Sequence, residues 1–182
     1  NSACRDGVRV LDVTVVGSLV DAKMAGMRNR DALEVARLSL GGGLGLIPLG
    51  IAFGMMVIQA GFPWWVAPVM SIVVYAGSVE LLLVSLIAAS TPVLTVGLTV
   101  LLVNVRHVFY AFSYPIDRVY GLARAYGVYA LTDETYAFIA GGEEHWTGGR
   151  IIWLQVLLQA YWVGGGLIGV ATALSLPRPI EG

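Results

Sequence analysis

The sequence predicts an all-α, polytopic integral membrane protein that folds as a helical bundle. Hydrophobic residues make up 57% of the 182 residues, and charged residues only 13%. A soluble domain typically carries about 25% charged residues, so this chain has too few polar groups to cover a water-exposed surface. Several apolar stretches also reach about 20 residues, the length a helix needs to cross the hydrocarbon core. About five membrane segments are expected.

Helices are favoured over a β-barrel by the pattern within these stretches. Backbone polar groups in lipid must be bonded internally, so a chain crosses a membrane as helices or as a closed barrel. Barrel strands alternate apolar and polar residues over about 10 positions. The apolar stretches show no such alternation, and the all-α class follows.

The first apolar stretch, residues 38–60, follows a polar leader. Residues 1–37 hold six of the eleven Lys and Arg residues, and we interpret them as a leader that is either disordered or not native to the chain. Gly50 and Gly54 are four residues apart, a spacing typical of close helix packing in lipid. The alternative for this stretch is that Gly43 and Pro48 break its helix beside a substrate.

The second stretch, residues 64–89, is the candidate for a broken or re-entrant segment. Gly77 and its small neighbours predict unwinding near mid-membrane. The arginines of the leader favour a cytoplasmic N-terminus. Simple alternation of spans would then place Arg118 and Arg124 outside, against the usual excess of cytoplasmic arginine. A second stretch that enters and leaves on one face removes this conflict.

Three further stretches complete the predicted membrane domain, residues 38–176. Residues 93–112 form the third stretch, 125–140 a short fourth one, and 151–176 the last span. A loop is expected at 141–149, and residues 177–182 are expected to be a truncated tail.

Glu80 lies deep in the second stretch, where an ionisable side chain is costly to insert and usually faces the bundle interior or a water-filled cavity. One interpretation is a polar site that holds a substrate ammonium or carries a proton. The other is a structural carboxyl group bonded to a neighbouring helix.

Asn104, Arg106 and His107 lie late in the third stretch. Arg106 offers a planar fork suited to a substrate carboxylate. Alternatively it extends to the interface, with His107 beside the aromatic belt of Tyr110 and Tyr114. A third possibility is that Arg106 neutralises a carboxylate elsewhere in the bundle, with Glu80 and Asp133 as the candidates.

Asp133 and Glu134 have two interpretations. Thr132 fits the cap of a helix whose first turn is acidic, which is ordinary helix-start chemistry. The alternative is an intramembrane carboxylate that pairs with Arg106 or relays protons.

Other chemistry finds no support in the sequence. The chain has one cysteine and two distant histidines, so no metal site is expected, and no catalytic or cofactor-binding motif is present. A net charge of −1 argues against nucleic-acid binding.

Four motifs in order carry a family resemblance: PLGIAFG (48–54), YAGSVE (75–80), LVNVRHVFY (102–110) and ALTDETY (130–136). Together they resemble the AzlC family of branched-chain amino acid permeases. The resemblance implies efflux of leucine, isoleucine, valine and, in some members, methionine across the bacterial inner membrane, with a small AzlD-like membrane subunit as partner. Many members have Gln where Glu80 stands, and members usually continue beyond this chain's last residue.

The expected cargo is therefore a small zwitterion with an apolar side chain. Glu80 or Asp133 is the candidate acceptor for the ammonium, and Asn104 and Arg106 are the candidate donors to the carboxylate. The apolar pocket is expected from Tyr75, Phe53 and Met56. The alternatives are a membrane scaffold without transport and an intramembrane enzyme based on Glu80, His107 and Asp133.

Overall fold

The computed structural model describes residues 13–110, 112–141 and 146–176, with side chains from residue 32 onward. All regular structure in these ranges is helical, which confirms the all-α class. The elements are α1 (Val13–Gln59), α2 (Val66–Val73), α3 (Gly77–Ala88), α4 (Val93–Asn104), α5 (His107–Tyr110), η1 (Ile116–Arg118), α6 (Leu122–Tyr129), α7 (Asp133–Gly141) and α8 (Gly148–Ser175).

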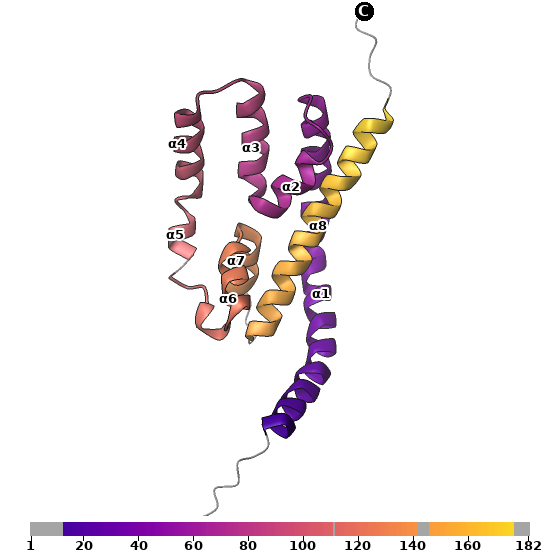
Figure 1. The fold of residues 1–182 in the computed structure, drawn as a ribbon, viewed down its shortest axis with the longest axis vertical. Helices are drawn as coiled ribbons and strands as arrows, with labels where there is room; N and C mark the ends of the chain where they lie inside the picture. The colour runs from indigo at the N-terminus through magenta and orange to yellow at the C-terminus, as the bar shows by residue number, and fades with distance from the viewer. Residues whose placement is uncertain (1–12, 111, 142–145, 177–182) are drawn as a thin grey trace, which may run out of the picture.

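Three stretches in the described ranges are long and apolar enough to cross a membrane: Ala32–Gln59, Val93–Tyr110 and Gly148–Ser175. The first and last belong to α1 and α8, which pack along each other and form the spine of the bundle (Figure 1). The short helices α2, α3, α6 and α7 pack around this spine, with α2–α3 near one end of the molecule and α6–α7 near the other.

Glycines let the α1 and α8 backbones touch. A Cβ atom on Gly50 would lie 2.7 Å from the carbonyl oxygen of Trp162, and one on Gly54 would overlap the carbonyl oxygen of Gly166. Backbones come this close only where side chains are absent from the contact. Gly50 and Gly54 therefore lie at the closest approach of α1 to α8.

The predicted break at Gly43 and Pro48 is wrong, because α1 continues as one helix through Pro48. A proline removes the hydrogen bond to the carbonyl four residues earlier and its ring crowds that carbonyl, but contacts with α8 hold the helix on both sides of Pro48. On one side Gly43 faces the ring of Tyr161, where a Cβ would lie 2.7 Å from Cε2. On the other side lies the close approach of Gly50 to α8.

The predicted boundary at residue 37 is not a break in secondary structure, since α1 begins at Val13 and runs through residues 13–37 into the first span. The interpretation of this leader as foreign to the chain stays a prediction. Residues 1–12, the predicted tail 177–182 and residues 142–145 of the predicted loop lie outside the described residues.

The second stretch is split, as predicted. The chain leaves the helix after Val73 and resumes it at Gly77, and between them Tyr75 adopts φ 43°. The fourth stretch is also split, into α6 and α7, which the sequence analysis did not expect. These helices have 8 and 9 residues, about 12–14 Å of helix, so neither crosses a membrane by itself.

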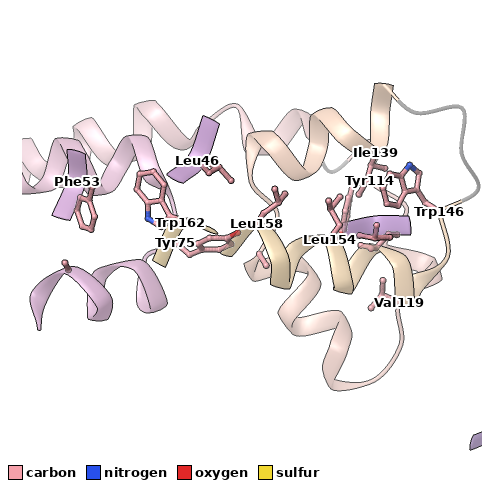
Figure 2. Packing of buried hydrophobic residues seen from close by; sticks show 14 of the residues in the cluster. Leu46, Phe53, Tyr75, Tyr114, Val119, Ile139, Trp146, Leu154, Leu158 and Trp162 are labelled. Atoms are coloured by element: carbon pink, nitrogen blue, oxygen red, sulfur yellow. The ribbon is translucent and has the colours of Figure 1, made fainter. Parts of the chain in front are cut away.

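The core of the bundle lies between α8 and the helices around it. Ile151, Leu154 and Leu158 on α8 are fully buried. Further along α8 the Trp162 ring stacks on Phe53 of α1, with the ring centroids 5.8 Å apart. Figure 2 shows Phe53, Trp162, Leu158 and Leu154 following one another along the bundle interior. By contrast, α4 has no buried residue.

Candidate functional site

A cavity of about 210 Å³ lies where the breaks of the second, third and fourth stretches come together. Drug-sized ligands occupy pockets of about 300 Å³ or more, so this volume suits a smaller solute. Its lining comes from five parts of the chain: Leu46, Leu49, Tyr75, Ala76, Gly77, Ser78, Leu81, Arg106, His107, Thr132, Asp133, Glu134 and Trp162.

One wall of the cavity is charged. The guanidinium Nη2 of Arg106 lies 2.6 Å from Oδ2 of Asp133, and it also donates a hydrogen bond of 3.0 Å to the hydroxyl of Ser78. The second carboxylate oxygen of Asp133 accepts a 2.7 Å hydrogen bond from the hydroxyl of Tyr110. Arg106 therefore neutralises Asp133, one of the two partners that the sequence suggested.

Two helix N-termini border the same cavity. α3 begins at Gly77 and α7 begins at Asp133, and both residues line the cavity. The first N–H groups of a helix have no partner within it and carry partial positive charge. Thr132 caps α7 weakly, since its hydroxyl accepts from the Thr135 backbone N–H at 3.4 Å. Asp133 therefore both opens a capped helix and pairs with Arg106, and its place within the membrane stays a prediction.

Glu134 and His107 complete the polar wall. Glu134 lines the cavity, and its carboxylate forms no hydrogen bond or ion pair within the described residues. Nδ1 of His107 lies 3.1 Å from the Asn104 carbonyl oxygen, and its ring contacts Tyr110 with centroids 5.2 Å apart. The predicted contact of His107 with the aromatic belt is thus present for Tyr110.

The rest of the lining is largely apolar. It includes Leu46 and Leu49 of α1, Leu81 of α3 and Trp162 of α8. Phe53 and Met56 are predicted here from the sequence, but neither lines the cavity. Phe53 is fully buried on Trp162 instead. Of the predicted pocket residues only Tyr75 lines the cavity.

Glu80 lies beside the cavity, not in its lining. It is fully buried, and its carboxyl group accepts hydrogen bonds from Ser71 at 2.8 Å and from the Ala76 backbone N–H at 3.1 Å. The indole N–H of Trp162 donates to both carboxyl oxygens, at 3.1 and 3.2 Å. These contacts match the structural interpretation of Glu80, and they hold the Trp162 ring that forms part of the cavity wall.

Two other predicted positions lie apart from the cavity. Asn104 ends α4 and does not line the cavity, although its neighbour Arg106 does. Tyr114 was expected in the aromatic belt but is buried in the core. Its hydroxyl donates to the Gly127 carbonyl oxygen at 3.2 Å, and burial raises the pKa of Tyr114 to about 12, so this group stays protonated.

A polar face of α8 was missed by the sequence analysis. Gln155 and Gln159 bind α6: Gln155 Nε2 donates to the Gly127 carbonyl at 2.8 Å, and Gln159 Oε1 accepts from the Tyr126 hydroxyl at 2.8 Å. Together with Trp162 they are spaced four and three residues apart, which places them on one helical face. That spacing, within an otherwise apolar run, was the available signal.

Comparison with known proteins gives one family and several curated relatives. The family model described as "AzlC protein" matches residues 43–176. An uncharacterized membrane protein of Helicobacter pylori is 35% identical over 131 residues, which cover 69% of this chain and 57% of that protein. The branched-chain amino acid transport protein AzlC of Bacillus subtilis is 32% identical, over 69% of this chain and 51% of that protein.

A third relative is the inner membrane protein YgaZ of Escherichia coli, which is 28% identical over 71% of this chain and 56% of that protein. The chain thus spans little more than half the length of these curated relatives. No solved structure matches the chain.

Proposed function

Because this chain belongs to the AzlC family, we propose that it is part of a secondary transporter subunit that exports branched-chain amino acids across the bacterial inner membrane. The observation that carries the proposal is a cavity whose lining combines charged side chains with apolar ones. A zwitterion with a short apolar side chain presents the same two surfaces, and few other small solutes do.

The carboxylate of the substrate is assigned to Arg106 and the N-terminus of α3. Arg106 has donors to spare in its planar fork, and its Nη2 already faces the cavity beside Ser78. The free N–H groups at the start of α3 add partial positive charge at the same place. Transporters commonly bind substrate carboxylates at broken helices in this way.

The ammonium of the substrate is assigned to Glu134. This residue lines the cavity, and its carboxylate has no bonded partner in the described part of the chain, whereas Asp133 is occupied by Arg106 and Tyr110. The aliphatic side chain then lies on Leu46, Leu49 and Leu81. Glu80, buried behind Trp162, holds the wall and does not contact the substrate in this assignment.

The runner-up is a membrane scaffold that uses glycine faces to dock partners. Gly50 and Gly54 of α1 argue against this function, because α8 already covers them. Two parts of the proposal are supported by the family resemblance alone. They are the AzlD-like partner subunit and the direction of transport.

The test is export by the full-length gene expressed with and without its neighbouring small membrane gene. Cells are loaded with dipeptides of leucine, valine, isoleucine, methionine or lysine, and the intracellular free amino acids are measured over time. We expect lower accumulation of the apolar amino acids only, with lysine as the matched control. Equal accumulation of leucine with and without the gene would support the scaffold instead.

A further inference from the structure

We infer that α2–α3 and α6–α7 are two half-membrane hairpins that enter the bilayer from opposite faces and meet at the cavity, with the arginine-rich end of the bundle in the cytoplasm. This inference concerns how the chain is placed in the membrane, and it does not depend on which solute is carried.

The lengths of the helices support the hairpins. The four short helices have 8, 12, 8 and 9 residues, which is about 12–18 Å of helix each. The hydrocarbon core is about 30 Å thick. Each of these helices therefore reaches only about half way, and each pair returns to the face from which it entered.

The depth of the cavity fits the meeting of the two hairpins. The spans Ala32–Gln59 and Gly148–Ser175 have 28 residues each, and the lining residues Leu46 and Trp162 lie next to their midpoints. The turn of the first hairpin contributes Tyr75 to the cavity, and the turn of the second contributes Thr132. Both turns thus lie near the middle of the long spans, and the two hairpins reach this level from opposite ends of the bundle.

The path of the chain gives each hairpin its own face. α1 and α8 run side by side in the same direction (Figure 1). α4–α5, which lies between them in the sequence but beside α3 at the other edge of the molecule, runs in the opposite direction. The α2–α3 pair leaves and rejoins the end of the molecule where α1 and α8 end. The α6–α7 pair leaves and rejoins the end where α8 begins. The chain therefore contains two span–hairpin–span units of opposite orientation that share α4–α5 as their common span. Inverted repeats of this kind are known among transporters.

Charge assigns the two ends to the two sides of the membrane. Arg150 lies in the first turn of α8 and pairs with Glu34 at 3.4 Å, which places Arg37, three residues further along α1, near this end. Arg118 donates to the Trp146 carbonyl oxygen just before α8, and Arg124 lies in the first turn of α6. The connections at the other end, residues 60–65 and 89–92, contain no charged residue but do contain the exposed Trp64 and Trp65. Arginine accumulates on the cytoplasmic side, and tryptophan marks membrane interfaces on either side. The arginine end therefore faces the cytoplasm.

This arrangement resolves the conflict that the sequence raised. With α2–α3 returning to its own face, Arg118 and Arg124 fall on the same side as the start of the first span. The cavity is then separated from the cytoplasm by the α6–α7 hairpin and from the outside by the α2–α3 hairpin. N-termini of two half-helices, those of α3 and α7, face the same space from opposite sides.

Single-cysteine labelling of the full-length protein in its own membrane tests the inference. Cys4 is replaced by serine, and cysteine is introduced at two exposed positions of each end: Trp64 and Ser90, and Tyr120 and Gly149. A membrane-impermeant maleimide is applied to intact spheroplasts and to inside-out vesicles. Leu98→Cys, in the exposed middle of α4, is the lipid-facing control.

We expect Trp64→Cys and Ser90→Cys to react in spheroplasts, and Tyr120→Cys and Gly149→Cys only in inside-out vesicles. Reaction of the first two from opposite sides would make α2–α3 a full span and overturn the inference. Reaction of Tyr120→Cys and Gly149→Cys from opposite sides would make α6–α7 a full span and would also overturn the inference. If all four cysteines reacted from the side opposite to the expected one, the proposed orientation would be wrong. Should a variant fail to reach the membrane, a neighbour on the same side of the same hairpin replaces it: Trp65→Cys for Trp64, Thr91→Cys for Ser90, Arg124→Cys for Tyr120 and Thr147→Cys for Gly149.

Discussion

The guanidinium of Arg106 lies 2.6 Å from the carboxylate of Asp133, and this ion pair joins the break of the third stretch to the start of α7. Through Ser78 the same guanidinium also reaches the start of α3. Three breaks that are far apart in the sequence thus meet at one charged group. Because isolated charges are costly in lipid, the pair neutralises itself while keeping an arginine at the cavity.

The α1–α8 seam gives the first prediction. Gly54→Ala should destabilise the folded protein by about 1–3 kcal/mol, as overpacking does in other cores, because its Cβ would overlap the Gly166 carbonyl oxygen. Gly41→Ala, on the same helix with no atom within 4 Å of its Cβ, is the matched control and should be neutral or slightly stabilising. Thermal unfolding in detergent measures the difference. Equal transition temperatures for the two variants would mean that the helices do not touch at Gly54.

The buried carboxyl group of Glu80 gives the second prediction. Glu80→Ala leaves the indole N–H of Trp162 and the hydroxyl of Ser71 without an acceptor, and each unsatisfied buried group costs about 1–3 kcal/mol. Glu80→Gln still accepts from Trp162 and should keep the fold. The yield of monodisperse protein should therefore fall for alanine and stay near wild type for glutamine. A glutamine variant as damaged as the alanine one would show that the carboxylate charge itself holds this site.

The apolar wall of the cavity gives the third prediction. Leu81→Trp fills part of the cavity, so export of leucine should fall by about tenfold, the size of effect that one or two carbon atoms have in an apolar pocket. Export of the smaller valine should fall less. Ile87→Trp, on the same helix but exposed, is the control. A uniform loss for both amino acids would place the side-chain pocket elsewhere.

The sequence predicts the helical class and the break near Gly77 because both depend on local composition. Low charge content requires lipid, and small residues beside a tyrosine weaken the helix there. It also singles out Arg106 and Asp133, since charges within apolar stretches are rare enough to stand out. Local composition does not predict which stretches contact each other.

The contacts between stretches could not be predicted in the same way. Pro48 resembles a helix break in sequence, but the packing of α1 on α8 keeps the helix intact. Phe53 and Leu81 are equally apolar, and only the fold decides that Phe53 stacks on Trp162 while Leu81 lines the cavity. Glu80 and Asp133 are both plausible partners for Arg106, and the choice depends on where α7 begins.

Binding of the substrate carboxylate by Arg106 is tested by transport in variants that neutralise the Arg106–Asp133 ion pair. Leucine export is measured for Arg106→Gln, Asp133→Asn and the double variant, normalised to the amount of folded protein. Arg124→Gln, an exposed arginine at the arginine-rich end, is the control.

Each single variant leaves one charge without its partner, so its yield of folded protein should fall. The double variant has neither charge, so its yield should recover. This variant should still export leucine about 10- to 100-fold more slowly than wild type, the effect of losing a charged hydrogen bond of about 1.5–3 kcal/mol. Wild-type export by the double variant would mean that the pair only holds the helices together, and it would contradict the account.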